Sequence, residues 1–281
     1  MFIGIKIITD SICDVPKDYA DRYGIRVMPL RVNFGSTSYI DGIDLTLEEF
    51  LKKLEAAEVL PTTSQVTPGD FLAAYREETA LGNKVISIHA SSQLSGTHDS
   101  AVIAKEQMPG SDINVIDTMG VSLGAGLLAI KAARLAEEGF EAEEIVKQIE
   151  ASKKKMKYMF ILNTLKYLQK GGRLSLPASV IGSILSIKPI LTVVNGKLEL
   201  LEKSRGMKKA IFSVMNRIKD NGWSLNGKTV GINHIANLES RDILEEQLKK
   251  EFKIKEFIRG EVGSVIATHG GPGAVAVHFE I

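Results

Sequence analysis

The sequence has almost no cysteine and no long apolar segment. Cys13 is the single cysteine among 281 residues, which excludes an internal disulfide framework and a cysteine-rich metal site and is typical of a reducing compartment. No run reaches the ~18 consecutive apolar residues of a membrane-spanning helix. The start, Met1–Asp10, turns acidic after one short apolar run without a small-residue cleavage site, so we expect a first strand, no signal peptide and a cytoplasmic protein.

The sequence also has little net charge and few motifs of cofactor chemistry. With 35 Lys and Arg against 34 Asp and Glu, the formal net charge is +1, which excludes the long-range field of a general nucleic-acid or membrane binder. No His, Asp and Glu set has metal-ligand spacing. Gly124-Ala125-Gly126 is a loose dinucleotide fingerprint, but it begins several residues after the strand pattern Ile113–Asp117, so we expect helix packing there.

Strand, loop and helix patterns alternate through the first half of the chain. The apolar runs Ile5–Thr9, Val85–His89 and Ile113–Asp117 each end in a polar loop, as buried parallel strands do. Capping-box spacing after Thr46 and Thr67 marks two helix entrances. This alternation predicts an α/β fold whose mostly parallel sheet is covered on both faces, with ligand sites at the carboxyl ends of the strands.

The second half of the chain follows a different pattern. Ile190–Val194 and Leu198–Glu202 flank the dipeptide Asn195-Gly196, which is typical of a two-residue hairpin and predicts a mixed sheet. Repeats, low-complexity tracts and a long linker are all missing, so the lobes are expected to share a close interface. We therefore predict an N-terminal α/β/α lobe over residues 1–157 and a C-terminal α/β lobe over residues 158–281.

Small polar residues gather before two predicted helices. Ser91–Thr97 directly follows a strand, and such a joint directs free backbone N–H groups at one point, which favours an anion. Ser95 could add an O–H donor and Gly96 allows close approach, although a plain N-cap role for Ser95 is equally expected. The hydroxyl run Thr62–Ser64 could also donate to an anion, but turns and caps are its commoner role.

Two further motifs carry donors for an anion. His269 stands beside three glycines in the stretch 269–274; a solvated turn residue is the usual role, and an anion donor is the alternative. Basic residues gather near the start of a predicted helix, with Arg173 upstream. A solvated face is again the usual role, and a contact to phosphate is the alternative. The cluster comprises Lys203, Arg205, Lys208 and Lys209.

Nine short motifs follow one another along nearly the whole chain. They are Ile8-Thr9-Asp10-Ser11, Asp41-Gly42, Thr63-Ser64-Gln65, Ser91 to Thr97, Asp117 with Ser122 and Gly124, Gly171 to Ser175, Lys188-Pro189-Ile190, Arg205 with Lys208-Lys209-Ala210, and Thr268 to Gly273. Each is weak alone, but in this order they resemble the DegV family, the fatty-acid-binding subunits of bacterial fatty acid kinases. The departures are Val66-Thr67, His98 and Thr118, which affect only the flank of the expected head-group site.

The resemblance implies a two-lobed DegV-like fold that encloses one long-chain fatty acid, with its carboxylate near the lobe junction. The residues implied to hold the carboxylate are Thr63, Ser64, Ser95, Gly96 and His269. Those implied to face a partner or a transferred phosphate are Arg173 and Arg205. The implied partner is a separate ATP-dependent kinase subunit that forms an acyl-phosphate for phospholipid synthesis; no nucleic acid, metal or other cofactor is implied, and any membrane contact is transient.

The acyl chain needs an apolar enclosure. The stretch Val180–Leu191 is unusually apolar for a segment interrupted by glycine, serine and proline, which predicts either part of a tunnel or an ordinary core helix. The residues expected to line the tunnel are Phe160, Ile181, Ile184, Leu185 and Ile187. At ~0.8 kcal/mol per buried CH₂, about fifteen methylenes contribute on the order of 12 kcal/mol before ordering costs.

Other function classes stay open on the sequence alone. Ser95 and His269 would suit a serine-type acyl hydrolase, although Leu94-Ser95-Gly96 lacks the Gly-x-Ser-x-Gly elbow that exposes the nucleophile. A carrier of another anionic lipid or small acid, and an adaptor with an empty apolar core, are further alternatives. Because the sequence has no nucleotide-binding loop, we expect a carrier subunit that takes part in catalysis only with a kinase partner.

Overall fold

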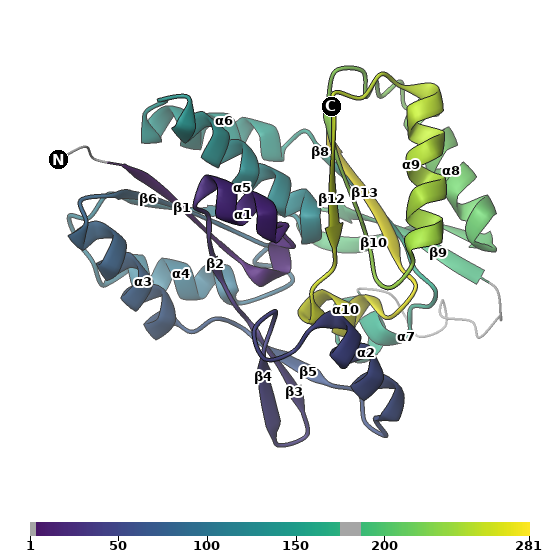
Figure 1. Cartoon of the computed structure of the whole chain (residues 1–281), viewed down its shortest axis with the longest axis horizontal. Helices are drawn as coiled ribbons and strands as arrows, with labels where there is room; N and C mark the ends of the chain where they lie inside the picture. Colours follow the sequence, from purple (N-terminus) through teal and green to yellow (C-terminus); the bar gives the residue numbers. More distant parts are fainter. Residues whose placement is uncertain (1–3, 175–186) are drawn as a thin grey trace.

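Two sheets, each at the centre of one lobe, organise the chain (Figure 1). The computed structural model describes residues 4–174 and 187–281. The first sheet has four parallel strands in the order β2-β1-β6-β7. The second has six strands in the order β10-β9-β8-β13-β11-β12, and only β11 and β12 pair in parallel. This confirms the predicted α/β fold with one parallel and one mixed sheet.

Apolar strands and amphipathic helices build the first lobe. Its strands are β1 (Ile5–Asp10), β2 (Arg26–Met28), β6 (Lys84–His89) and β7 (Ile113–Asp117). Its helices are α1 (Lys17–Tyr23), α3 (Pro68–Ala80), α4 (Thr97–Glu106), α5 (Ser122–Glu137) and α6 (Ala142–Lys153), preceded by the short 3₁₀ helix η1 (Ser11–Cys13). Figure 1 shows α1, α5 and α6 on one face of the sheet and α3 and α4 on the other. Covering both faces explains why these strands are continuous apolar runs.

The predicted helix entrances are confirmed by their caps. At the start of α2 (Leu47–Ala56), the Thr46 side chain accepts a hydrogen bond from the Glu49 N–H, and the Glu49 side chain accepts one from the Thr46 N–H. The same reciprocal pair forms between Thr67 and Asp70 before α3. Each cap satisfies two backbone donors that the helix itself leaves without an acceptor. The caps therefore fix where both helices enter the fold.

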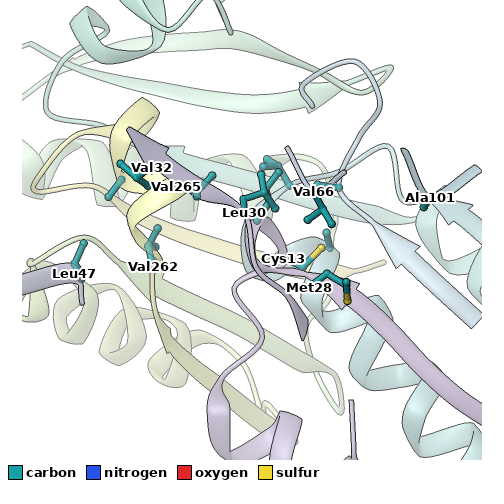
Figure 2. Packing of buried hydrophobic residues seen from close by; sticks show 14 of the residues in the cluster. Cys13, Met28, Leu30, Val32, Leu47, Val66, Ala101, Val262 and Val265 are labelled. Atoms are coloured by element: carbon teal, nitrogen blue, oxygen red, sulfur yellow. The ribbon is translucent and has the colours of Figure 1, made fainter. Parts of the chain in front are cut away.

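A small third sheet was not predicted from the sequence. It consists of β3 (Arg31–Phe34), β4 (Thr37–Ile40) and β5 (Thr62–Ser64), antiparallel in the order β4-β3-β5. Three to four residues are too few for a recognisable alternation of polar and apolar side chains. The sheet packs on α10 (Ser264–Gly270) of the second lobe, and Figure 2 shows Val262 and Val265 beside Leu30 and Val32.

The second lobe carries its covering helices on the outer face of its sheet. Its strands are β8 (Met156–Ile161), β9 (Ile187–Val194), β10 (Lys197–Arg205), β11 (Thr229–His234), β12 (Glu256–Glu261) and β13 (Val275–Glu280). Its other helices are α7 (Lys166–Lys170), α8 (Met207–Asp220) and α9 (Leu238–Glu251). Asn195 and Gly196 adopt φ of 48° and 78° in the β9–β10 turn, as a two-residue hairpin requires. The predicted boundary between residues 157 and 158 falls inside β8, so we propose a boundary between α6 and β8 instead.

Helix α5 joins the two lobes because it packs against both sheets (Figure 1). A Cβ on Gly126 would overlap the carbonyl oxygen of Cys13, and one on Gly124 would overlap the ring of Tyr158. These glycines therefore allow close helix packing, as predicted in place of a dinucleotide site. At the other end of α5, Arg134 donates two hydrogen bonds of 2.7 and 2.8 Å to Glu256 of β12, which lowers the pKa of Glu256 to about 2.

Candidate functional site

A cavity lies at the junction of the two lobes, where the carboxyl ends of the first sheet face the second sheet. The volume that the centres of water molecules can occupy in it is about 150 Å³. This is about ten times the minimum volume for one water. Most of its wall is hydrocarbon. The apolar residues that line it are Ile12, Leu30, Leu94, Val121, Phe160, Leu162, Leu168, Leu191, Leu198, Ile235, Val262, Val265, Ile266, Ala274, Val275 and Ala276.

Polar residues from four separate segments also line this cavity, and we call them the head-group cluster. They come from β5 and the residue after it, from the loop before α4, from the turn after α7, and from α10. The head-group cluster consists of Thr63, Gln65, Ser95, Gly96, Arg173 and His269. Four of the five residues that the resemblance assigns to a carboxylate are therefore in one cavity wall.

The side chains of Thr63 and Ser64, which are adjacent in β5, point to different sides of the strand. The Thr63 Oγ1 lies 3.0 Å from His269 Nε2, so the strand and α10 meet at the cavity. The Ser64 Oγ instead accepts a hydrogen bond of 2.8 Å from Asn33 of β3, and Ser64 is exposed. Alternation along a strand requires this separation. The Ser64 hydroxyl consequently does not reach the cavity.

The loop before α4 contributes Ser95 and Gly96 to the cavity wall. The N-cap of α4 is Gly96, which has no side chain to cap the helix, and N–H groups of the first turn lack an intrahelical acceptor. The Ser95 Oγ lies 2.9 Å from Thr97 Oγ1 and takes the Thr97 N–H at 3.3 Å. Gln65 donates to Gly96 O at 3.1 Å and to Ser100 Oγ at 2.8 Å. A Cβ on Gly96 would displace the Gln65 side chain, which accounts for the glycine.

Two acidic residues, the buried Asp10 and the partly buried Asp117, hold this loop in place. The Asp10 carboxylate lies 2.8 Å from His89 Nδ1 and accepts the Ala90 N–H at 3.3 Å. Asp117 accepts the Ser92 N–H at 3.2 Å. Ser91 donates to Gly196 O of the β9–β10 turn at 2.8 Å, so the loop is also tied to the second lobe. Asp10 and Asp117 thus position the loop, and neither of them lines the cavity.

Arg173 and His269 give the head-group cluster its electrostatic character. Arg173 donates to Leu94 O at 3.2 Å and to Gly171 O at 2.6 Å, which leaves other N–H groups of its guanidinium for a ligand. Burial, and then the positive charge of Arg173, lower the pKa of His269 to about 4. Near neutral pH the cluster therefore carries one fixed positive charge beside a neutral imidazole, which is suited to a single carboxylate.

The same geometry argues against a serine hydrolase. The ring nitrogen of His269 that has a partner, Nε2, faces Thr63 rather than Ser95. Its other nitrogen, Nδ1, is buried without a hydrogen-bond partner among the described residues. A triad requires a nucleophile bonded to the base and a carboxylate that orients the base. Neither bond is present within residues 4–174 and 187–281.

The remaining predicted residues take different places. Phe160 lines the cavity. Ile187 is half-buried at the start of β9 and lies outside the lining, while Ile181, Ile184 and Leu185 fall outside the described residues. Arg205 is exposed at the end of β10, also outside the lining. The missed lining residues, such as Leu191 and Leu198, have the sequence pattern of ordinary core strands, and no motif distinguishes them.

Among the residues that the structure describes, no helix has both the length and the apolar character needed to cross a bilayer. In the same part of the chain, no three His, Cys, Asp or Glu side chains are grouped so that they could hold a metal ion.

Because it is buried, His278 is expected to destabilise the folded protein at acid pH. It is fully buried on β13, and burial lowers its pKa from the ordinary 6.5 to about 3. Between these values the unfolded chain binds a proton that the folded chain does not, so the free energy of unfolding falls as the pH drops from 6.5 towards 3. At pH 4.5 this amounts to about 2–3 kcal/mol.

The variant His278→Gln removes the titrating group and keeps a donor for Asn233, which His278 Nε2 contacts at 3.3 Å. Urea unfolding at pH 8 and pH 4.5 measures the change in stability for each protein. The wild type should lose about 2 kcal/mol more than the variant between the two pH values. Equal losses in both proteins would contradict this role for His278.

Comparison with known proteins places the chain among close relatives. Residues 4–281 match the family model described as "Uncharacterised protein, DegV family". A DegV domain-containing protein of Caldanaerobacter subterraneus subsp. tengcongensis is 41% identical over 276 residues, 98% of each chain. A Thermus thermophilus structure described as fatty acid binding of a DegV family protein is 32% identical, with a TM-score of 0.93 over 99% of this chain and 100% of the other. The Bacillus subtilis structure of DegV, a fatty acid binding protein, is 33% identical, with a TM-score of 0.88 over 100% of both chains.

Proposed function

This chain belongs to the DegV family, and we propose that it is a carrier that binds one long-chain fatty acid in the junction cavity. The carboxylate lies at the head-group cluster and the acyl chain lies along the hydrocarbon wall. The observation that carries this proposal is the cavity itself, which combines sixteen apolar lining residues with one arginine and a few neutral donors. The solved relatives described as fatty acid binding support the same ligand.

The head-group cluster suits a carboxylate for a physical reason. Moving a carboxylate out of water costs several kcal/mol unless hydrogen bonds and an opposite charge replace its hydration. Arg173 supplies the charge, and Thr63, Ser95 and the N–H groups that begin α4 supply neutral donors. His269 adds a donor in its neutral form. A bound anion next to His269 would also favour the protonated imidazole, so acid pH should strengthen the contact.

The apolar wall supplies the larger share of the affinity. Each buried methylene contributes ~0.8 kcal/mol, so about fifteen give on the order of 12 kcal/mol before the cost of ordering the chain. Retention at micromolar concentration or below follows from that sum. The cavity walls come from both lobes, so they enclose the chain only in the folded arrangement. The ligand should accordingly stabilise the protein against unfolding.

We further propose that the bound carboxylate is presented to a separate ATP-dependent kinase subunit, which forms an acyl-phosphate for phospholipid synthesis. Ser95 and His269 lack triad geometry, so the chain supplies binding rather than independent catalysis. Arg205 and Lys208 are exposed at the β10–α8 junction, outside the cavity wall. Exposed cations of this kind suit an acidic partner surface or a phosphate.

Arg205→Glu should separate partner contact from fatty acid binding. Reversing an exposed charge opposite an acidic surface lowers association, so we expect the kinase-coupled rate to fall at least tenfold. The assay follows ATP-dependent acyl-phosphate formation by the loaded carrier with a DegV-compatible kinase subunit. Fatty acid affinity, measured by calorimetry, should stay unchanged because Arg205 does not line the cavity. Glu199→Lys, on the same strand, serves as the charge-change control, and an unchanged rate for Arg205→Glu would exclude the docking role.

A further inference from the structure

A second polar group, not part of the head-group cluster, interrupts the hydrocarbon wall of the cavity. Ser122, the first residue of α5, and Asn233 of β11 both line the cavity. The Asn233 Nδ2 donates to Ser122 Oγ at 2.8 Å, and Ser122 Oγ lies 2.5 Å from Asp14 Oδ2. No hydrogen bond links these residues to the head-group cluster within the described chain. A fatty acid with a plain hydrocarbon chain makes no use of such a group.

The hydrogen bonds leave a donor unused. The Asn233 Oδ1 lies 3.3 Å from His278 Nε2, which assigns the amide orientation, and Nδ2 reaches only Ser122 among the residues described. A primary amide has two N–H groups, so one of them is left without an acceptor. Asn233 is 0% exposed, and a buried donor without an acceptor costs free energy that a suitable ligand atom can recover.

Asp14 holds Ser122 in place, because its Oδ2 accepts a hydrogen bond from the Ser122 hydroxyl. Its other oxygen, Oδ1, already accepts the Gly263 N–H at 2.8 Å. The Ser122 Oγ, which donates to Asp14, also accepts from Asn233. A hydroxyl oxygen has two acceptor lone pairs, so one of them stays available to a donor on the ligand, beside the unused N–H of Asn233.

We propose that Ser122 and Asn233 recognise an oxygen atom carried on the acyl chain, so that the preferred ligand is a hydroxy or oxo fatty acid. This inference rests on the proposed fatty acid binding and specifies the chemical class of fatty acid that the cavity prefers. A hydroxyl on the chain can accept the unused N–H of Asn233 and donate to Ser122 Oγ, and a ketone oxygen can accept the same N–H, whereas a methylene leaves that N–H unpaired. Sites that hydrogen-bond a ligand oxygen discriminate strongly against the analogue that lacks it.

The test compares ligands of equal length in the full-length protein after removal of lipid. Calorimetry measures the dissociation constants of stearic acid and of hydroxystearic acids substituted at successive carbons. We expect at least one hydroxy isomer to bind about tenfold more tightly than stearic acid. In Asn233→Leu, which removes the amide, this ratio should fall below about twofold. Ser122→Ala is a second variant, in which the side chain changes less because only one hydroxyl is removed. Circular dichroism shows whether each variant is folded.

The outcomes separate the two proposals. If stearic acid binds and no hydroxy isomer binds more tightly, the inference about the chain is wrong and the carrier function stands. If neither ligand binds the folded wild-type protein, both proposals fail. A preference that persists unchanged in folded Asn233→Leu and Ser122→Ala would assign the recognition to other residues and overturn this one.

Discussion

Arg173→Leu is expected to lower the affinity for a long-chain fatty acid about 100-fold, because it removes the only fixed positive charge that lines the described cavity. Truncating one partner of a desolvated charge pair typically costs 2–5 kcal/mol. Calorimetry with palmitic acid near neutral pH measures the loss. His269 does not compensate there, since burial, the largest cause of its lowered pKa, remains in the variant.

A ligand without charge separates the electrostatic effect from a structural one. Arg173 also bonds Leu94 O and Gly171 O, so its loss could loosen the cavity wall. Hexadecanol keeps the hydrocarbon chain and lacks the carboxylate, and its affinity should change less than threefold in Arg173→Leu. Arg205→Leu is the matched control outside the cavity and should leave both ligands unaffected. Equal losses for palmitic acid and hexadecanol would show that Arg173 acts only on structure.

Gly126→Ala is expected to destabilise the protein by about 2 kcal/mol. Alanine normally favours a helix interior over glycine by ~1 kcal/mol, but a Cβ at position 126 would overlap the Cys13 carbonyl oxygen, which belongs to the backbone and has little room to shift. Overpacking of this kind typically costs 1–3 kcal/mol. Because Val121 and Ser122 at the start of α5 line the cavity, a displaced helix should weaken fatty acid binding as well.

Gly69→Ala is the matched control for this prediction. Gly69 lies in the first turn of α3, and a Cβ there would make only an ordinary contact of 3.7 Å with Thr67 Oγ1. The same substitution should therefore leave stability unchanged or raise it by about 0.5 kcal/mol. Urea unfolding of the three proteins gives the comparison. A Gly126→Ala variant as stable as wild type would mean that α5 packs less closely on η1.

The regular elements could be predicted because their signals are local. Capping boxes at Thr46 and Thr67, the hairpin dipeptide Asn195-Gly196 and the apolar strands of the parallel sheet each follow from neighbouring residues. The small sheet of β3, β4 and β5 could not be predicted in this way. Its strands are short, and its stability comes from α10, which lies about two hundred residues further along the chain.

The candidate site was predictable only where a motif marks it. Thr63, Ser95, Gly96 and His269 belong to recognisable motifs, and the structure brings them to one cavity wall. His269 has a glycine-rich sequence context that suggests a solvated turn, yet it is the penultimate residue of α10 and partly buried. Ser64 has the same motif signal as Thr63 but points to the opposite side of β5. Strand register, which decides such cases, depends on pairing across the fold.

The hydrocarbon wall gives no sequence signal of its own. Leucine and valine residues that face a cavity have the same period as residues that face a packed core. Only the arrangement of the two lobes decides that Leu191 and Leu198 face a ligand space. For the same reason the polar pair of Ser122 and Asn233 could not be recognised, since its members are 111 positions apart.

Denaturing solvent extraction of the purified protein, followed by mass spectrometry of the extract, tests the carrier function most directly. About one equivalent of a long-chain fatty acid per chain is expected, and a prominent hydroxy or oxo acid would support the inference about Ser122 and Asn233. Another anionic lipid in its place would keep the carrier function and change its ligand. An empty extract from folded protein that also takes up no added fatty acid would contradict the carrier function.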